Sequence, residues 1–146
     1  MSVRVVLNYL GLVLVMFGVL LVFPLAWSLV VKDGAEVCFL IPIAVACGTG
    51  GVLWRFIPRE NRILTRREGL ALVTCTWLSA SVVGALPFTI SGTLPRFVDA
   101  FFETMSGFTT TGATVIPWIG DQPPSVLLWR QFTQWIGGMG IVTIFV

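Results

Sequence analysis

The residues with the clearest chemical potential form one polar stretch, which reads Phe108-Thr109-Thr110-Thr111-Gly112-Ala113-Thr114. Threonines grouped around a glycine are poor helix formers, so we expect extended backbone here. Gly112 permits a positive φ, which keeps successive carbonyl oxygens turned to the same side. Carbonyl oxygens arranged in this way can replace the hydration shell of a monovalent cation. The stretch therefore predicts a cation site lined by backbone, with the threonine hydroxyls in a secondary role.

The stretch has two other interpretations. The glycines at 107 and 112 have the spacing of a phosphate loop, but Ala113 and Thr114 stand where that motif requires lysine and serine or threonine. A phosphate site is therefore excluded. An ordinary loop beside an amphipathic surface helix stays open from the spacing alone.

A short helix is predicted immediately before the stretch, with Pro95 in its first turn and Gly107 at its end. Thr93 or Ser91 can cap its beginning. A helix of about 11 residues is roughly 16 Å long, enough to reach the middle of a membrane but not to cross it. Its carboxyl end adds partial negative charge where the chain enters the polar stretch.

Two carboxylates, Asp99 and Glu103, lie four residues apart on one face of this predicted helix, near its mouth. An acid–base pair is one use of such spacing, but no nucleophile accompanies it. We expect the two side chains to attract cations or to compensate the helix dipole.

The composition indicates that the solvent of these elements is a lipid bilayer. Of 146 residues, 56% are hydrophobic and 11% charged, against about 25% charged in soluble domains, and the mean hydropathy is +0.94. The chain contains no histidine, which excludes Ser-His-Asp hydrolysis and histidine-ligated metals. Its three cysteines form no CxxC pair, and its net charge of +2 is too small to indicate nucleic-acid binding. We therefore expect a membrane protein that is not an enzyme.

Four apolar runs predict an all-α protein with four transmembrane helices, namely Val5–Val31, Val37–Phe56, Gly69–Ile90 and Val126–Val146. Pro24 interrupts the first run and predicts a kink there. The segment between the third and fourth runs is then expected to enter the membrane and return as a re-entrant pore helix and filter loop. Extended backbone is tolerated at that depth only where protein buries it or water lines it.

The distribution of positive charge predicts the orientation. The loop between the second and third runs contains five arginines, whereas the loop between the first two has one lysine balanced by acids. By the positive-inside rule the arginine loop and both ends of the chain are cytoplasmic. The arginines are Arg55, Arg59, Arg62, Arg66 and Arg67.

Tryptophans and small residues refine this arrangement. We expect Trp27, Trp54, Trp118 and Trp129 at the membrane interfaces, and Trp77 and Trp135 in packing positions. Pairs of small residues four apart favour close helix contacts, although chance explains any single pair equally well. The pairs are Ala44 with Gly48, Ala46 with Gly50, Cys47 with Gly51, and Ala80 with Gly84.

Two motifs together resemble a known family. FFETMSGFTTTGAT followed by WRQFTQWIGGMGIV is similar to the first pore loop and following helix of the Trk/Ktr/HKT potassium transporters, and most similar to the bacterial Trk-type membrane subunits. The resemblance covers the whole chain in order. It implies that residues 1–67 are an extra amino-terminal helix pair with a basic cytoplasmic loop, and that residues 68–146 are the first M1–pore loop–M2 repeat.

The resemblance also implies a site, an ion and partners. In this family potassium binds backbone carbonyls around one glycine per repeat, which here implies Thr110, Thr111, Gly112 and Ala113. It implies potassium uptake across the bacterial inner membrane, a homodimer when complete, and a cytoplasmic nucleotide-binding regulatory subunit. Channel-like and ion-coupled transport both stay open.

The chain departs from the family in having one loop unit where members have four around a single pore. We therefore expect the amino-terminal part of a longer transporter, which needs its remaining repeats to conduct. A non-conducting structural or assembly subunit is the alternative from a different functional class. A truncated fragment without activity of its own would have the same sequence pattern.

Overall fold

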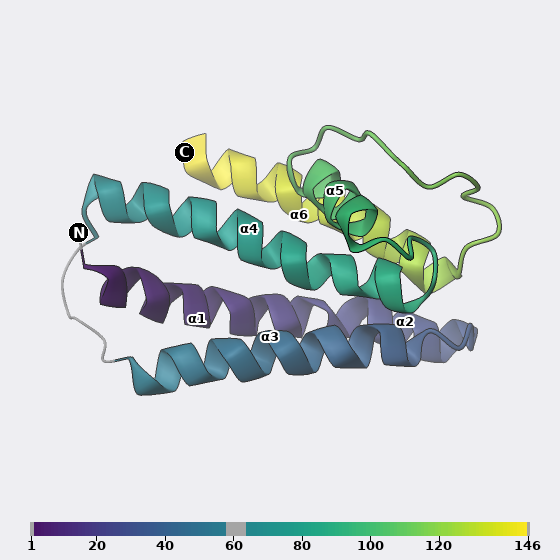
Figure 1. Ribbon diagram of the computed structural model, residues 1–146, viewed down its shortest axis with the longest axis horizontal. Helices are drawn as coiled ribbons and strands as arrows, with labels where there is room; N and C mark the ends of the chain where they lie inside the picture. The colour runs from purple at the N-terminus through teal and green to yellow at the C-terminus, as the bar shows by residue number, and fades with distance from the viewer. Residues whose placement is uncertain (1, 58–63, 146) are drawn as a thin grey trace.

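The computed structural model describes residues 2–57 and 64–145, and its regular elements in those ranges are helices. They are α1 (Val3–Leu20), α2 (Val22–Val31), α3 (Glu36–Phe56), α4 (Arg66–Ile90), α5 (Phe97–Phe108) and α6 (Pro124–Phe145). Figure 1 shows α1, α3 and α4 running side by side, with α5 nearly end-on beside α4 and α6. Both ends of the chain lie toward one end of the bundle, and the α2–α3 turn and the long loop after α5 lie toward the other. The predicted all-α class is confirmed.

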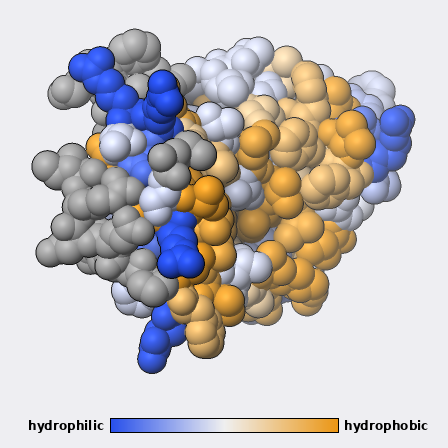
Figure 2. Space-filling model, turned by 60° about the vertical axis from the view of Figure 1, so that its left-hand side comes forward, coloured by the Kyte–Doolittle hydropathy of each residue, from blue (hydrophilic) through white to orange (hydrophobic). Residues whose placement is uncertain are grey.

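Three segments are long and apolar enough to cross a membrane. They are Val3–Val31, which joins α1 and α2, together with Glu36–Phe56 and Arg66–Ile90, so the first three predicted runs are confirmed. The fourth predicted run coincides with α6, a helix of 22 residues, but it is not among the candidate spans within the described residues. Figure 2 shows a broad hydrophobic surface between more hydrophilic ends, which is the pattern that a bilayer requires.

The predicted kink at Pro24 lies at the junction of α1 and α2. A proline has no N–H to donate to the carbonyl four residues earlier, and its ring collides with that carbonyl. The affected carbonyl is that of Leu20, where α1 ends. The chain passes through Leu21 and resumes as α2 at Val22. Sequence and local geometry therefore agree at this position.

The α1–α3 contact is a backbone-to-backbone crossing at two glycines. A Cβ added at Gly11 would lie 2.7 Å from the Gly50 carbonyl oxygen, and one at Gly50 would lie 2.6 Å from the Gly11 carbonyl oxygen. Ala46, one turn before Gly50, is fully buried. The Ala46–Gly50 pair is therefore used in packing, whereas a Cβ at Gly48 or Gly51 would meet no atom within 4 Å.

Polar groups fasten both ends of the bundle. At the beginning of α4, Thr65 and Glu68 form a capping box, and Glu68 Oε1 also accepts the Ser2 backbone N–H at 2.7 Å. At the opposite end, Asp33 Oδ2 accepts the backbone N–H of Ser125 at 2.9 Å, across 92 positions of sequence. Asp33 thus binds the α2–α3 turn to the first turn of α6.

The tryptophans differ in exposure. Trp27, Trp54 and Trp118 are exposed, and their location at a membrane interface stays a prediction. Trp129 is fully buried, so its predicted interfacial position is wrong. The reason is a partner in the interior, because its Nε1–H donates to the Gly84 carbonyl at 2.9 Å. Trp135 was expected to pack inside, but it is 58% exposed.

Candidate functional site

The candidate site begins with α5, which packs between α4 and α6 at three glycines. A Cβ at Gly84 would lie 2.7 Å from Thr104 Cγ2. A Cβ at Gly107 would collide with the Thr133 side chain, and one at Gly137 would collide with the Phe108 carbonyl. Because each glycine belongs to a different helix, α5 is held closely from both sides.

An aromatic cluster fixes the carboxyl end of α5. Phe108 is 1% exposed, and its ring centroid lies 5.8 Å from those of both Phe17 and Trp77. Trp129 meets Phe17 edge-on at the same centroid distance of 5.8 Å. Edge-to-face contacts add to the stabilisation from burial alone. Phe108, the first residue of the polar stretch, is therefore among the most firmly packed of the described residues.

The beginning of α5 differs from the expectation. Its N-cap residue is Arg96, and the side chain of that residue makes no capping hydrogen bond. Ser91 and Thr93 were predicted caps, but their hydroxyls bond to each other at 2.9 Å, and Ser91 Oγ also donates to the Phe88 carbonyl at 3.2 Å. The capping prediction is wrong because these side chains finish α4 instead.

The end of α5 is a Schellman motif, one residue beyond the predicted end at Gly107. The Thr111 N–H donates to the Ser106 carbonyl at 3.0 Å, and the Thr110 N–H donates to the Gly107 carbonyl at 2.9 Å. The motif needs a left-handed residue, usually glycine, and here Thr110 takes that conformation with φ 56°. A β-branched residue with positive φ is a true outlier. The sequence contained no signal for this strain.

The predicted site residues Thr110, Thr111, Gly112 and Ala113 lie consecutively in turn and irregular backbone instead of the extended backbone that was expected, and all four are exposed in this chain. Gly112 has φ 74°, so the predicted positive φ is confirmed. A Cβ added at Gly112 would meet only Gln134 Nε2, at 3.9 Å. Position 112 therefore requires glycine because of its positive φ, and not because neighbouring atoms of this chain would collide with a side chain.

Ser106 holds both sides of this backbone. Its carbonyl accepts the N–H groups of Thr111 and Gly112, at 3.0 and 3.4 Å. Its hydroxyl donates to the Ala113 carbonyl at 2.7 Å. The Ala113 carbonyl is thus already engaged by one hydrogen bond. The neighbouring hydroxyls satisfy one another, because Thr109 Oγ1 lies 2.9 Å from Thr111 Oγ1.

Glu103 is the central support of the loop, a role that the sequence did not reveal. Its Oε1 lies 2.7 Å from Arg130 Nε on α6, and its Oε2 accepts the Val115 backbone N–H at 2.9 Å. The side chains of Glu103 and Arg130 are only 1% and 12% exposed. The expectation that Glu103 attracts cations is wrong, because Arg130 neutralises it inside the protein.

Asp99 has the second expected role, compensation of the helix dipole. It lies in the first turn of α5, where a carboxylate compensates the helix dipole. Its Oδ2 is 3.6 Å from Arg96 Nε, and the Arg96 side chain is 80% exposed. The two carboxylates predicted as a pair therefore serve different purposes, one at the surface and one inside.

These features define a class before any comparison. The chain is a helical membrane protein in which a half-length helix, packed between two longer ones, ends in a firmly supported loop of exposed residues. The family model described as TrkH, cation transport protein, matches residues 37–146. The chain belongs to this cation transport family, whose members are transporters and not enzymes.

Individual relatives agree. The Trk system potassium uptake protein TrkH of Halomonas elongata is 38% identical over 147 aligned residues, which cover 100% of this chain and 30% of that protein. An uncharacterized cation transporter of Methanocaldococcus jannaschii is 36% identical, covering 95% of this chain and 29% of the relative. The crystal structure of the potassium transporter TrkH from Vibrio parahaemolyticus superposes with a TM-score of 0.91 at 38% identity, covering 97% of this chain and 31% of that one. The chain thus spans about three tenths of the length of the relatives that it matches.

Proposed function

We propose that this chain is the first loop-and-helix unit, preceded by two extra helices, of a potassium uptake transporter of the bacterial inner membrane. The observation that carries the proposal is the run of exposed residues Thr110–Ala113, which Ser106 holds from the side of α5, while Glu103 holds the following residue Val115. The relatives named potassium uptake proteins support the identity of the ion. Potassium is here the transported substrate.

In this proposal α5 enters the membrane and the loop returns from it, so that the carbonyls of Thr110, Thr111 and Gly112 coordinate potassium. The Ala113 carbonyl contributes with the lone pair that Ser106 leaves free. One loop supplies one side of a carbonyl ring, and the remaining repeats of a longer chain supply the others. The loop is fastened from its α5 side, and Ser106 engages the Ala113 carbonyl, so in this proposal the carbonyls of Thr110, Thr111 and Gly112 are the main ligands of the ion.

The proposal includes an arrangement for the whole unit. Residues 1–67 form the helix pair and basic loop, residues 68–146 form the repeat, and α6 is the fourth span. Both ends of this segment are cytoplasmic, and a homodimer with a cytoplasmic nucleotide-binding regulatory subunit completes the transporter. Arg59 and Arg62 of the basic loop lie outside the described residues, whereas Arg55, Arg66 and Arg67 are exposed.

A structural or assembly subunit that does not conduct is the alternative, and the exposure of a single loop is the observation that favours it. Such a subunit would depend on the packing of α5 but not on the conformation of Gly112. The two functions therefore make different predictions for the same residue.

The test is Gly112→Ser in the intact transporter that carries this chain. A side chain at φ 74° is strained, by about 1–2 kcal/mol, which displaces neighbouring carbonyls. We expect reduced discrimination of potassium over sodium, with membrane insertion unchanged. Rubidium uptake under sodium competition measures the effect, and growth on limiting potassium supports it.

Two further variants make the test selective. Gly120→Ser is the matched control, because Gly120 has neither a positive φ nor an atom within 4 Å of an added Cβ. Thr111→Val should be mild, since the proposed ligand is the carbonyl. Unchanged selectivity in Gly112→Ser with complete loss in Thr111→Val would replace the carbonyl site by a side-chain site. Unchanged uptake in both would favour the assembly subunit.

The orientation has its own test. A cysteine at Arg67, an exposed position at the beginning of α4, should resist an impermeant thiol reagent in intact cells and react after permeabilisation. A cysteine at Trp118, which is 75% exposed, should react without permeabilisation. Labelling in the opposite order would reverse the topology.

A further inference from the structure

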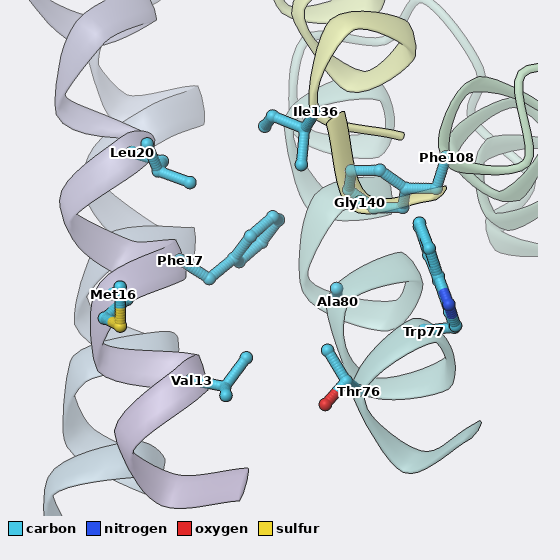
Figure 3. A pocket seen from close by; sticks show the side chains of 10 residues that line it. All are labelled: Val13, Met16, Phe17, Leu20, Thr76, Trp77, Ala80, Phe108, Ile136 and Gly140. Carbon is cyan, nitrogen blue, oxygen red and sulfur yellow. The ribbon is translucent and has the colours of Figure 1, made fainter. Parts of the chain in front are cut away.

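A groove between α1, α4 and α6 has no role in the proposed potassium site. It contains a cavity of about 280 Å³ whose lining includes Val13, Phe17, Trp77 and Gly140. Figure 3 shows Val13 and Phe17 pointing from α1 into the space toward α4 and α6. A second hollow of about 260 Å³ shares Val13, Trp77 and Gly140 and continues along α4. The two form one groove.

The lining of the groove excludes water as a stable filling. Apart from the Thr76 hydroxyl and the Trp77 ring nitrogen, the side chains that line the larger cavity carry no oxygen or nitrogen. An apolar cavity of about 150 Å³, roughly half this size, stays dry and binds small apolar molecules. The groove also opens to the surface, because Met16 on its rim is 60% exposed. In a bilayer the apolar molecule at such an opening is a lipid acyl chain.

The helical register places a positive charge at one end of the groove. The smaller hollow continues to Val73 and Leu72, and Arg66 lies two turns before Val73, on the same face of α4 as Trp77. Arg66 is exposed. Arg67 lies instead on the face of Leu70 and Leu78, which are 71% and 49% exposed and point away from the bundle. One arginine therefore lies in line with the groove, and its neighbour does not.

We propose that this groove binds one acyl chain of an anionic phospholipid, with the phosphate of its headgroup beside Arg66. The apolar lining, which runs from one hollow into the next along α4, fits a hydrocarbon chain, and the arginine complements a negative headgroup in the adjacent leaflet. The proposal depends on the chain being embedded in a membrane. It is independent of the potassium path, so that a failure of one leaves the other standing.

The test is native mass spectrometry of the intact transporter in detergent, with phosphatidylglycerol and phosphatidylcholine added in equal amounts. Thr76→Phe fills the groove and should remove one tightly bound phosphatidylglycerol. Thr74→Phe is the matched control, because Thr74 is an exposed residue of the same helix outside the groove. It should keep the lipid. Equal numbers of bound lipid in the two variants would overturn the proposal.

The arginines provide a second measurement that does not depend on tolerance of a large side chain. Arg66→Gln should lower the preference for phosphatidylglycerol about fivefold, and Arg67→Gln should leave it within about twofold. Equal effects of the two would overturn the assignment of the headgroup to Arg66. If another segment of the longer protein covers the groove, Thr76→Phe lowers the melting temperature with no change in bound lipid. That outcome also overturns the proposal.

Discussion

The α1–α3 pair and the loop after α5 are held in place by opposite means. The helix pair meets backbone to backbone at Gly11 and Gly50, in a contact of apolar surfaces. The loop is held by directed bonds from Ser106 and Glu103, all made from the side of α5. The difference shows how a chain rich in apolar residues can keep a polar loop in place. Packing of apolar helices positions α5, and a few hydrogen bonds from α5 hold one face of the loop while its opposite face can contact an ion.

The largest effect is expected where the support of the loop is both charged and buried. Arg130→Met would leave Glu103, whose side chain is 1% exposed, without its counter-ion. Breaking a buried pair from one side costs about 3–5 kcal/mol. We expect a strongly lowered melting temperature in detergent, and a large part of it restored in the double variant Glu103→Gln/Arg130→Met.

Arg96→Met is the matched control for this variant. Arg96 pairs with Asp99 at the surface, where its side chain is 80% exposed, and such pairs contribute about 0–1 kcal/mol. A similar loss from both arginine variants would show that burial of the Glu103–Arg130 pair is not what stabilises the loop.

The helix pair should respond to volume instead of charge. Gly50→Val places a side chain against the backbone of α1, where a Cβ alone would lie 2.6 Å from the Gly11 carbonyl oxygen. Overpacking of this kind destabilises by about 1–3 kcal/mol. Gly48→Val, on the open face of the same helix, should change the melting temperature little. Equal melting temperatures of Gly50→Val and Gly48→Val would show that the contact between Gly11 and Gly50 does not hold α1 and α3 together.

A smaller effect of opposite sign is expected at the strained end of α5. Thr110→Gly removes a left-handed β-branched residue and should stabilise the protein by about 1 kcal/mol. Thr109→Gly, where φ is −82°, should destabilise it by about 0.5–1 kcal/mol. Thermal melting of the two variants distinguishes strain relief from a general effect of glycine. Stabilisation by both, or by neither, would contradict the assignment of strain to Thr110.

The smallest effect concerns pH at the α2–α3 turn. Burial alone would raise the pKa of Asp33, but hydrogen bonds from Ser125, Ser28 and Ala35 lower it below its ordinary value. A lowered pKa in the folded state means that the contribution of Asp33 is complete above about pH 4 and is lost as the pH falls further. Asp33→Asn should therefore melt nearer to the parent protein at pH 3 than at pH 6. A difference that grows toward acid would contradict this sign.

The same contrast explains how far the sequence could be interpreted. Local patterns predicted the three candidate membrane spans, the break at Pro24, the short helix before the loop and the positive φ of Gly112. Each of these depends on a residue and its near neighbours. The Glu103–Arg130 pair joins residues 27 positions apart, and the burial of Trp129 depends on the Gly84 carbonyl 45 positions away. These contacts form because particular faces of two helices pack against each other. The residue pattern of a single helix does not show which helix its faces will contact.

The bond between Asp33 and the backbone of Ser125 also bears on the order in which the chain assembles. Domains form from the amino terminus as synthesis proceeds, so the α2–α3 turn is made long before residue 125 exists. Its hydrogen bonds with Ser28 and Ala35 are local and hold the carboxylate in place early. When α6 arrives, its first free N–H groups meet an acceptor that is already in position. The α2–α3 turn thereby marks the point at which α6 begins.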